Sequence, residues 1–320
     1  MSTVSSRGRV RAAASLLAVA CTTALSACGG EAADESAAVS SQEVTVTHAQ
    51  GETTVPVNPE TVITLDLASL DTLDQLGVQV DGLPKGSTLP PDFAAFASDE
   101  YLDAGTLQEP DYEAIAAADP DLIIVAGRSA ATLPQLSEIA PTIDLSTDAT
   151  DFLGSVRGNA ETLGRIFGKE AEAESLLATL DSDIEATREA AADAGTGLIV
   201  MTNGGEVTAY GPGSRFGFLH DVLGLTPAVE DVEAATHGEA VSFEFIAEAN
   251  PDWLFVVDRD AAIGSGGAAA AQVLDNPLVA GTTAWSSDQV VYVDSADWYI
   301  TSGGLGTLDQ ILDQVTSALA

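Results

Sequence analysis

The sequence predicts an α/β protein of two lobes, each a mostly parallel sheet with flanking helices, joined by one long helix. Short apolar runs of strand length alternate with helical periods on both sides of a single long helical stretch. A weak internal repeat relates the two sides, and the helical stretch lies between its two copies. We therefore expect two related lobes, one on each side of a connecting helix.

The first lobe is expected where the pattern becomes strand-like. Residues 44–47 alternate as a strand does, and residues 62–65 are typical of a second strand. Residues 67–76 have a helical apolar period. The run Leu122–Ala126, after Asp-Pro-Asp, is typical of a buried parallel strand. Residues 44–168 are therefore predicted to form the N-terminal lobe.

Residues 152–192 form the longest helical stretch. Gly168 interrupts it and Gly195 follows its end, so residues 169–192 are the predicted connecting helix. Strand-like runs then resume and a last helical period closes the chain. They are Leu198–Met201, Val207–Tyr210, Leu254–Val257 and Val290–Val293, with the helix at Leu305–Leu319. Residues 193–320 are predicted to form the C-terminal lobe.

Residues 1–27 have the composition of a secretory signal peptide. Three arginines precede an apolar stretch that is too short to span a membrane. The stretch ends in Leu25-Ser-Ala-Cys28 and two glycines, which resembles the bacterial lipobox; a cysteine carrying two acyl chains is a stable anchor. An ordinary cleaved signal with a chance cysteine is the alternative. Residues 28–43 lack aromatic residues and are expected to be a flexible tether.

Charge and motif content argue against several classes of function. The formal net charge is −38, which repels nucleic acid and anionic lipid. No nucleophile elbow, P-loop, His-Glu-x-x-His motif or paired cysteine ligands occur, so neither enzymatic activity nor an intrinsic cofactor is expected. Cys21 and Cys28 are the only cysteines, so the processed chain has no internal disulfide.

The internal repeat places two arginines at equivalent positions. In each copy a glutamate lies seven residues before a proline and an arginine eight after it, giving Glu113 with Arg128 and Glu244 with Arg259. Both arginines follow a predicted strand at its carboxyl end, where α/β proteins bind ligands. Arg215 lies in a glycine-rich loop after a predicted hairpin. Three guanidiniums on so acidic a chain indicate an anion site, unless each pairs with a nearby carboxylate.

His237 and Tyr299 lie in predicted loops, Tyr299 after a strand. Imidazole and phenolate are suitable ligands for Fe(III). A lone histidine in a loop is more often structural, so the residues themselves leave both interpretations open.

Several segments from about residue 44 to the end share a family pattern. They are Leu122–Arg128, Tyr210–Gly217, Thr236–Gly238, Val241–Ile246, Asn250–Asp252, Leu254–Arg259, Leu274–Asn276 and Trp298-Tyr299. Together they resemble the siderophore-binding lipoproteins of bacterial ABC importers, in the subgroup that binds enterobactin-type and petrobactin-type ferric catecholates. The resemblance implies two lobes joined by a rigid interlobe helix, with limited closure.

The resemblance also implies a role for each candidate residue in the cleft. Arg128, Arg215 and Arg259 match arginines that surround the anionic ferric siderophore. His237 and Tyr299 match the pair that completes iron coordination when a siderophore supplies only four oxygens. Iron(III) is thus expected as part of the bound complex, and a metal role for His237 and Tyr299 only with tetradentate siderophores.

Partners and location follow from the same resemblance. Glu113 and Glu244 match surface glutamates that dock onto the permease, which works with its ATPase. The protein is expected to be a monomer outside the cytoplasm, anchored by lipid to the outer face of the cytoplasmic membrane, and not to bind nucleic acid. A binding protein for haem, cobalamin or a hydroxamate siderophore is the alternative, although three arginines favour a strongly anionic cargo over neutral hydroxamates.

Overall fold

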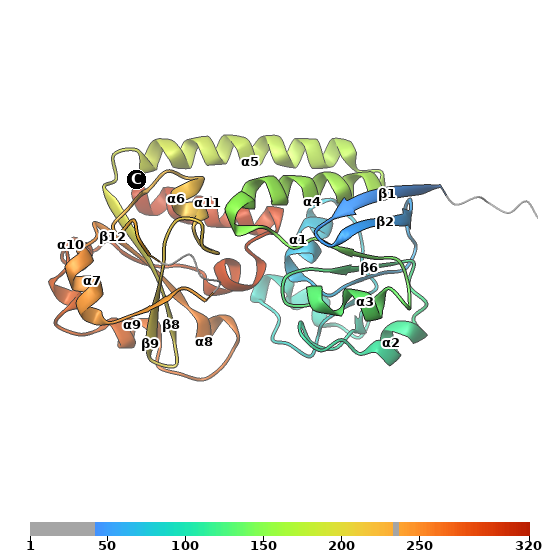
Figure 1. Cartoon of the computed structure of the whole chain (residues 1–320), viewed down its shortest axis with the longest axis horizontal. Coiled ribbons are helices and arrows are strands. Elements are labelled where there is room, and N and C mark those ends of the chain that lie inside the picture. The colour runs from blue at the N-terminus through green and yellow to red at the C-terminus, as the bar shows by residue number, and fades with distance from the viewer. Residues whose placement is uncertain (1–41, 233–236) are drawn as a thin grey trace, which may run out of the picture. The chain divides into compact units, whose positions relative to one another are not determined.

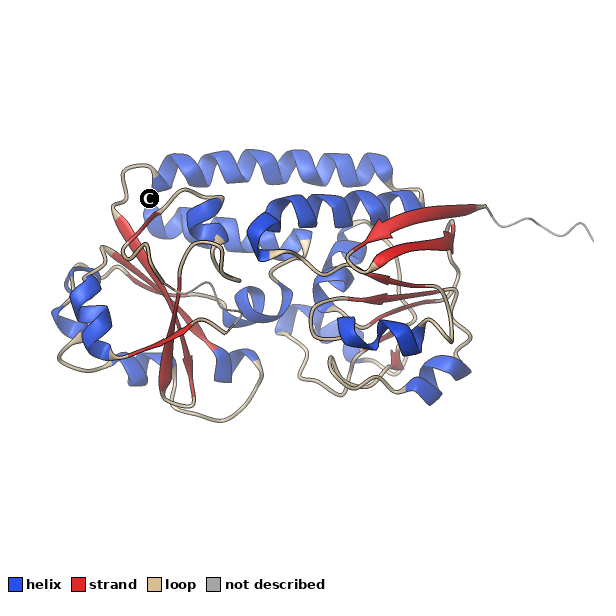
Figure 2. Cartoon of the chain, in the orientation of Figure 1, coloured by secondary structure: helices blue, strands red, loops and turns tan. Residues whose placement is uncertain are grey.

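Two α/β lobes make up the part of the chain that the structure describes (Figure 1). The computed structural model describes residues 42–232 and 237–320. The expected signal peptide, Cys28 and the tether up to residue 41 lie outside the described residues. Strand β1 begins at Glu43, so the last residue of the expected tether belongs to a strand instead. Each lobe holds a largely parallel sheet flanked by helices (Figure 2), which confirms the predicted fold class.

The N-terminal lobe is built on a five-stranded parallel sheet of order β5-β4-β3-β6-β7. Its strands are β3 (Val62–Thr64), β4 (Gly82–Leu83), β5 (Leu102–Asp103), β6 (Leu122–Val125) and β7 (Thr142–Asp144). The strand order changes direction between β3 and β6, and α/β proteins bind ligands outside the carboxyl ends of the strands at such a reversal. An antiparallel hairpin of β1 (Glu43–His48) and β2 (Gly51–Pro56) lies against β7 and α4.

The C-terminal lobe holds a six-stranded sheet of order β11-β9-β8-β12-β13, with β10 paired to β8. Its strands are β8 (Thr196–Asn203), β9 (Glu206–Tyr210), β10 (Thr226–Pro227), β11 (Glu239–Val241), β12 (Trp253–Asp258) and β13 (Val290–Tyr292). Strands β8, β10, β12 and β13 run parallel, whereas β9 and β11 extend one edge as antiparallel strands. The predicted hairpin is thus the β8-β9 pair.

Short helical segments flank both sheets. The α-helices among them are α2 (Tyr112–Ala117), α3 (Leu133–Leu136), α6 (Phe218–Asp221), α7 (Phe243–Ala249), α8 (Arg259–Ala262), α9 (Ala270–Leu274) and α10 (Thr283–Ser286). The 3₁₀-helical segments are η1 (Pro91–Ala97), η2 (Ala130–Thr132), η3 (Ala149–Asp151) and η4 (Val279–Gly281), and η5 (Asp297–Thr301) is a π-helical turn. Within the described residues, no helix combines the length and the apolar composition needed to cross a bilayer.

Helices α4 (Phe152–Phe167) and α5 (Glu170–Ala191) join the lobes. Gly168 ends α4 with a φ of 61°, a left-handed conformation that glycine adopts at little cost. Helix α5 runs along both lobes (Figure 1). Ala173 packs in the N-terminal core, whereas Leu180 packs in the C-terminal core. Helix α4 also contributes side chains to both cores, so a second helix reinforces the predicted one.

A further connection is made by α11 (Leu305–Leu319), which packs along α5 and meets α1 (Leu67–Gln75) at its N-terminus. The carboxylate of Asp71 in α1 accepts hydrogen bonds from the backbone amides of Gly306, at 2.7 Å, and Thr307, at 3.0 Å. Burial raises the pKa of Asp71 to about 6, although these two hydrogen bonds act in the opposite direction. The buried carboxyl group of Asp71 therefore links α11 to the N-terminal lobe through hydrogen bonds.

The internal repeat is visible in three dimensions. Asp119 and Asn250 follow α2 and α7 with left-handed φ values of 51° and 42°. Two residues later, the carboxylates of Asp121 and Asp252 accept hydrogen bonds from backbone amides at the start of the neighbouring strand, β3 or β8. In both lobes, a helix end followed by proline and aspartate thus leads into the next strand, which is β6 after α2 and β12 after α7. These matched devices place β6 and β12 at equivalent positions.

Candidate functional site: a cationic cleft between the lobes

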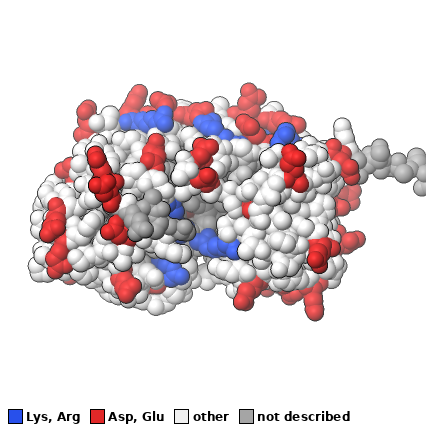
Figure 3. All heavy atoms as spheres, in the orientation of Figure 1, with Lys and Arg blue, Asp and Glu red and all other residues white. Residues whose placement is uncertain are grey.

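A cleft of about 670 Å³ lies between the lobes. Arg128 and Phe152 line it from one side, and Arg215, His237 and Tyr299 line it from the other. Figure 3 shows basic side chains in the hollow between the lobes, while acidic side chains are spread over the surrounding surface. The strongly acidic chain thus has a locally positive cavity.

Tyr299 lies at the centre of the three predicted arginines. Its carbonyl oxygen accepts hydrogen bonds from Nη2 of Arg128, at 2.8 Å, and from Nη2 of Arg215, at 3.0 Å. Its hydroxyl group accepts a hydrogen bond from Nε of Arg259, at 3.1 Å. The guanidiniums lie 4.9, 4.5 and 5.7 Å from the ring centroid, within the range of cation–π contacts. The structure therefore brings together the three arginines and the tyrosine that the sequence singled out.

Arg259 differs in position from the other two arginines. Arg128 and Arg215 line the cleft, whereas Arg259 is not among the residues that line it. Arg259 instead bonds to the Tyr299 hydroxyl and, through Nη1, to the side-chain oxygen of Asn203 at 3.0 Å. Arg259 therefore contacts Tyr299 from outside the lining of the cleft.

The carboxylate-pairing alternative fails for these arginines within the described residues. Ion pairs within 4.0 Å in that part of the chain join Arg157 to Asp181, Lys169 to Glu172 and Arg188 to Glu185. None of them involves Arg128, Arg215 or Arg259. Three basic residues of the connecting segment thus have carboxylate partners, whereas the arginines around Tyr299 have none within that distance among the described residues.

The three guanidiniums alter the acid–base behaviour of the site. Burial acts to raise the pKa of Tyr299, but the hydrogen bond from Arg259 and the charges of all three arginines outweigh it and lower that pKa. Burial and the like charge of Arg128 lower the pKa of Arg215. A phenol with a lowered pKa is more easily converted to the phenolate that binds Fe(III), and a bound anion would relieve the repulsion between the guanidiniums.

Tyr299 is held in place by its neighbour Trp298 in the turn η5. Trp298 is fully buried, with its ring 5.3 Å from that of Phe218 and 6.2 Å from that of Phe216. Such π-helical turns occur frequently at functional sites. The packing of Trp298 in the core anchors the segment of η5 that carries Tyr299.

His237 is exposed and lines the same cleft as Tyr299. Its backbone oxygen accepts a hydrogen bond from the hydroxyl group of the buried Tyr210, at 3.0 Å. Residues 233–236, which precede it, lie outside the described residues. Groups of three or more potential metal-ligating His, Cys, Asp or Glu side chains are absent from the described residues. A metal role for His237 and Tyr299 therefore stays a prediction that depends on ligands supplied by the cargo.

Glu113 and Glu244 occupy matching places in the two lobes. Each lies in the first turn of a short helix, α2 or α7, and each is exposed. Asp111 and Ser242 cap those helices through their side chains. The two carboxylates are therefore presented in the same way, once per lobe.

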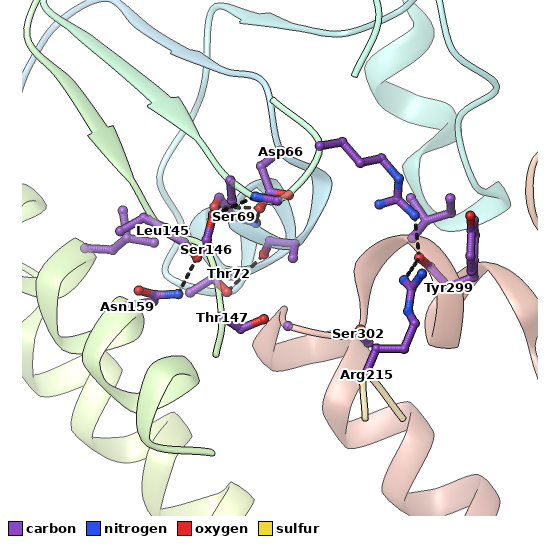
Figure 4. Close-up of a pocket in the computed structure, with 17 residues that line it drawn as sticks. Asp66, Ser69, Thr72, Leu145, Ser146, Thr147, Asn159, Arg215, Tyr299 and Ser302 are labelled. Carbon is purple, nitrogen blue, oxygen red and sulfur yellow. Dashed lines mark hydrogen bonds between the residues drawn. The ribbon is translucent and has the colours of Figure 1, made fainter. Parts of the chain in front are cut away.

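A second, inner cavity of about 150 Å³ adjoins the cleft and contains groups that the sequence analysis missed (Figure 4). We call it the inner chamber. It shares Arg128, Arg215 and Tyr299 with the cleft. Its remaining wall comes from α1, α4, the strand ends and the turn η5, and includes Asp66, Ser69, Ser146 and Asn159. Asp66 follows β3 at its carboxyl end, so the rule that singled out Arg128 also applied to Asp66.

Two α/β lobes joined by helices, with a cleft lined from both lobes, define a two-lobed solute-binding protein. Residues 62–296 match the periplasmic binding protein family, and the chain belongs to that family. The match begins at β3 and ends just before Tyr299, so it spans both sheets.

Relatives of known specificity cover nearly the whole chain. The petrobactin-binding protein YclQ of Bacillus subtilis is 41% identical over 95% of this chain and 98% of that protein. Its crystal structure superposes with a TM-score of 0.85 at 42% identity, covering 87% of this chain and 99% of that one. The periplasmic catecholate-siderophore binding protein VctP of Vibrio cholerae gives a TM-score of 0.81 at 31% identity, over 86% of this chain and all of that one. The ferric-anguibactin-binding protein FatB of Vibrio anguillarum is 33% identical over 85% of this chain and 86% of that protein.

Proposed function

We propose that this chain is the solute-binding protein of an ABC importer and that its cargo is an anionic ferric siderophore of the catecholate type. The observation that carries the proposal is the group of three arginines around Tyr299, none of which has a carboxylate partner within 4.0 Å among the described residues. Charges kept without a counterion in a cavity are suited to an anionic ligand.

A ferric catecholate fits this arrangement chemically. A tris-catecholate complex of Fe(III) carries a net charge of about −3, so it attracts several guanidiniums at once. The rings of Tyr299 and Phe152 offer apolar contact for the flat faces of catechols. Relatives that bind petrobactin, ferric anguibactin or catecholate siderophores support the same class of cargo. Neutral hydroxamate complexes would leave the arginines without a partner.

The number of iron-coordinating oxygens in the siderophore determines how many coordination positions are left for the protein to fill. Fe(III) prefers six hard ligands, and a hexadentate siderophore supplies all of them. A tetradentate siderophore leaves two positions, which we assign to His237 and Tyr299. The lowered pKa of Tyr299 supports this role because coordination requires the phenolate.

Attachment and delivery complete the proposal. We infer that residues 1–27 are removed and that Cys28 carries lipid, which tethers the protein outside the cell membrane through residues 28–43. The lobes would comprise residues 44–168 and 193–320, joined by residues 169–192. They would then present Glu113 and Glu244 to the permease, which works with its ATPase. We expect a monomer without enzymatic activity and without a resident cofactor.

The proposed function is tested by direct binding. The three tryptophans include Trp298, whose ring is buried next to Tyr299, so quenching of fluorescence reports on the cleft. We expect tight, saturable quenching by a ferric tris-catecholate and much weaker quenching by a ferric trihydroxamate or by haem. Preferred binding of the hydroxamate or of haem would contradict the proposal.

A further inference from the structure

The two lobes also touch at a point away from the connecting helices. A Cβ atom placed on Gly264 would lie 3.1 Å from Oγ1 and 3.2 Å from Cγ2 of Thr88, closer than ordinary van der Waals contact at 3.4–4 Å. Thr88 follows β4 in the N-terminal lobe, whereas Gly264 follows α8 in the C-terminal lobe. Figure 1 shows α8 at the end of its lobe opposite α5. We call this approach of Thr88 and Gly264 the rim contact.

Glycine at position 264 allows the lobes to come this close. Its φ is 64°, a left-handed conformation that glycine adopts at little cost, and any larger residue would direct its Cβ atom at Thr88. The amide of Gly264 donates a hydrogen bond to the backbone oxygen of Ala261 at 3.1 Å, which closes the turn at the end of α8. The rim contact is therefore made by backbone whose position α8 determines.

Helix α8 connects the rim contact to Tyr299 in the cleft. Its first residue, Arg259, donates from Nε to the Tyr299 hydroxyl group. The carboxylate of Asp260 accepts hydrogen bonds from a backbone amide in the β8-β9 turn, at 2.8 Å, and from the Ser265 hydroxyl group, at 3.0 Å. Arg259 and Gly264 are thus parts of one hydrogen-bonded unit attached to the end of β8.

The segment that carries Thr88 is connected to the cleft in a similar way. The hydroxyl group of Ser87 accepts a hydrogen bond from the amide of Leu107 at 3.3 Å, and the next residue, Gln108, lines the cleft. Nζ of Lys85 donates to two backbone oxygens just before β5, at 2.8 and 3.1 Å, which holds the segment in place. Each side of the rim contact is therefore joined, within its own lobe, to a residue that lines the cleft.

We propose that the rim contact is a latch between the lobes and that it is coupled to the cleft, so that bound cargo stabilises the contact and the contact retains the cargo. This inference rests on the proposed function. A cargo that touches both lobes favours one separation of the lobes, and the rim contact requires one separation, so each stabilises the other. Helices α4 and α5 join the lobes at the opposite end, so a change of angle there displaces Thr88 from Gly264 more than it displaces residues near the helices.

The test makes the rim contact covalent. A Cβ atom on Gly264 would lie 3.5 Å from Cβ of Thr88, at the short end of the range for a disulfide. In the double variant Thr88→Cys, Gly264→Cys, we expect a ferric tris-catecholate to increase the rate of disulfide formation about fivefold or more. We also expect cargo that is loaded before oxidation to leave about fivefold or more slowly until the disulfide is reduced. Peptide mass spectrometry identifies the linkage, and each single-cysteine variant is the control for oxidation itself.

The outcomes separate this inference from the proposed function. An unchanged rate in either measurement would overturn the latch, and so would a double variant that forms no disulfide with or without cargo. Failure of the wild type and of the reduced double variant to bind the ferric tris-catecholate would instead overturn the proposed function.

A second pair of variants tests the latch without cysteine. Gly264→Leu places a side chain against Thr88, whereas Gly77→Leu meets nothing within 4 Å. The two glycines have similar φ values, 64° and 69°, so both variants carry the same kind of backbone strain. We expect cargo to leave Gly264→Leu about fivefold or more quickly than the wild type, and to leave Gly77→Leu at the wild-type rate. Equal release rates in the two variants would contradict the latch.

Discussion

The buried carboxyl group of Asp71 makes stability depend on pH in a direction opposite to that of most acidic residues. Its pKa is raised from 3.8 to about 6 in the folded protein, mainly by burial. The folded state therefore binds the proton more tightly than the unfolded state. The group adds stability at pH values below 3.8, and this contribution is lost as the pH rises through about 6.

The size of the effect on stability follows from the shift in the pKa of Asp71. The difference between 3.8 and about 6 corresponds to about 3 kcal/mol in the free energy of unfolding. About 2 kcal/mol of this falls between pH ~4.5 and pH ~7.5. Asp71→Asn removes the titration but keeps an oxygen that accepts from the amides of Gly306 and Thr307. Relative to the wild type, the variant should therefore gain about 2 kcal/mol of stability across that pH range.

Urea unfolding of both proteins at a series of pH values measures this difference. Comparing the two proteins cancels the contributions of other titrating groups, provided that they are independent of Asp71. A difference between Asp71→Asn and the wild type that does not change with pH would refute the reasoning.

Three further predictions follow from the proposed function. Cys28→Ala should release the protein from the membrane fraction, and retention at the wild-type level would contradict lipid attachment. Reversing Glu113 and Glu244 to Lys together should abolish uptake and leave siderophore affinity intact, whereas normal transport would remove the docking role. His237→Ala and Tyr299→Phe should weaken tetradentate ferric complexes strongly, change their visible spectrum, and barely affect hexadentate ones. Equal losses for the two ligand classes would argue against direct coordination of iron.

Sequence patterns were most informative where one local rule decides the structure. The buried run of β6, the strand-end position of Arg128 and its repeat in the other lobe were all predictable, because parallel strands end at one edge of a sheet. The hairpin before Arg215 was also predictable from alternation and glycine. Strands β4 and β5 were missed because two residues each are too few to form a pattern.

Features that depend on tertiary packing were not predictable. Nothing in the sequence around Tyr299 indicates that three arginines meet on its carbonyl group, ring and hydroxyl group. Asn159 looks like any polar residue of a helix until α4 is placed against the strand ends. Asp66 is different, because it follows a predicted strand and the strand-end rule would have found it. Residues 152–167 were predicted to be helical, but their role in joining the lobes was not, because α4 divides its apolar face between two cores.

The affinity of single arginine variants for a ferric tris-catecholate tests the central claim most directly. Arg128→Gln and Arg215→Gln each remove from the cleft a charge that has no ion pair among the described residues, whereas Arg188→Gln removes a charge that is already paired with Glu185 on α5. A charge-assisted contact is worth about 1.5–3 kcal/mol, and about 1.4 kcal/mol corresponds to one decade of affinity. We predict that Kd rises about tenfold or more for each cleft variant and stays at the wild-type value for Arg188→Gln. Equal, small changes in all three variants would contradict the assignment of the cleft as the siderophore site.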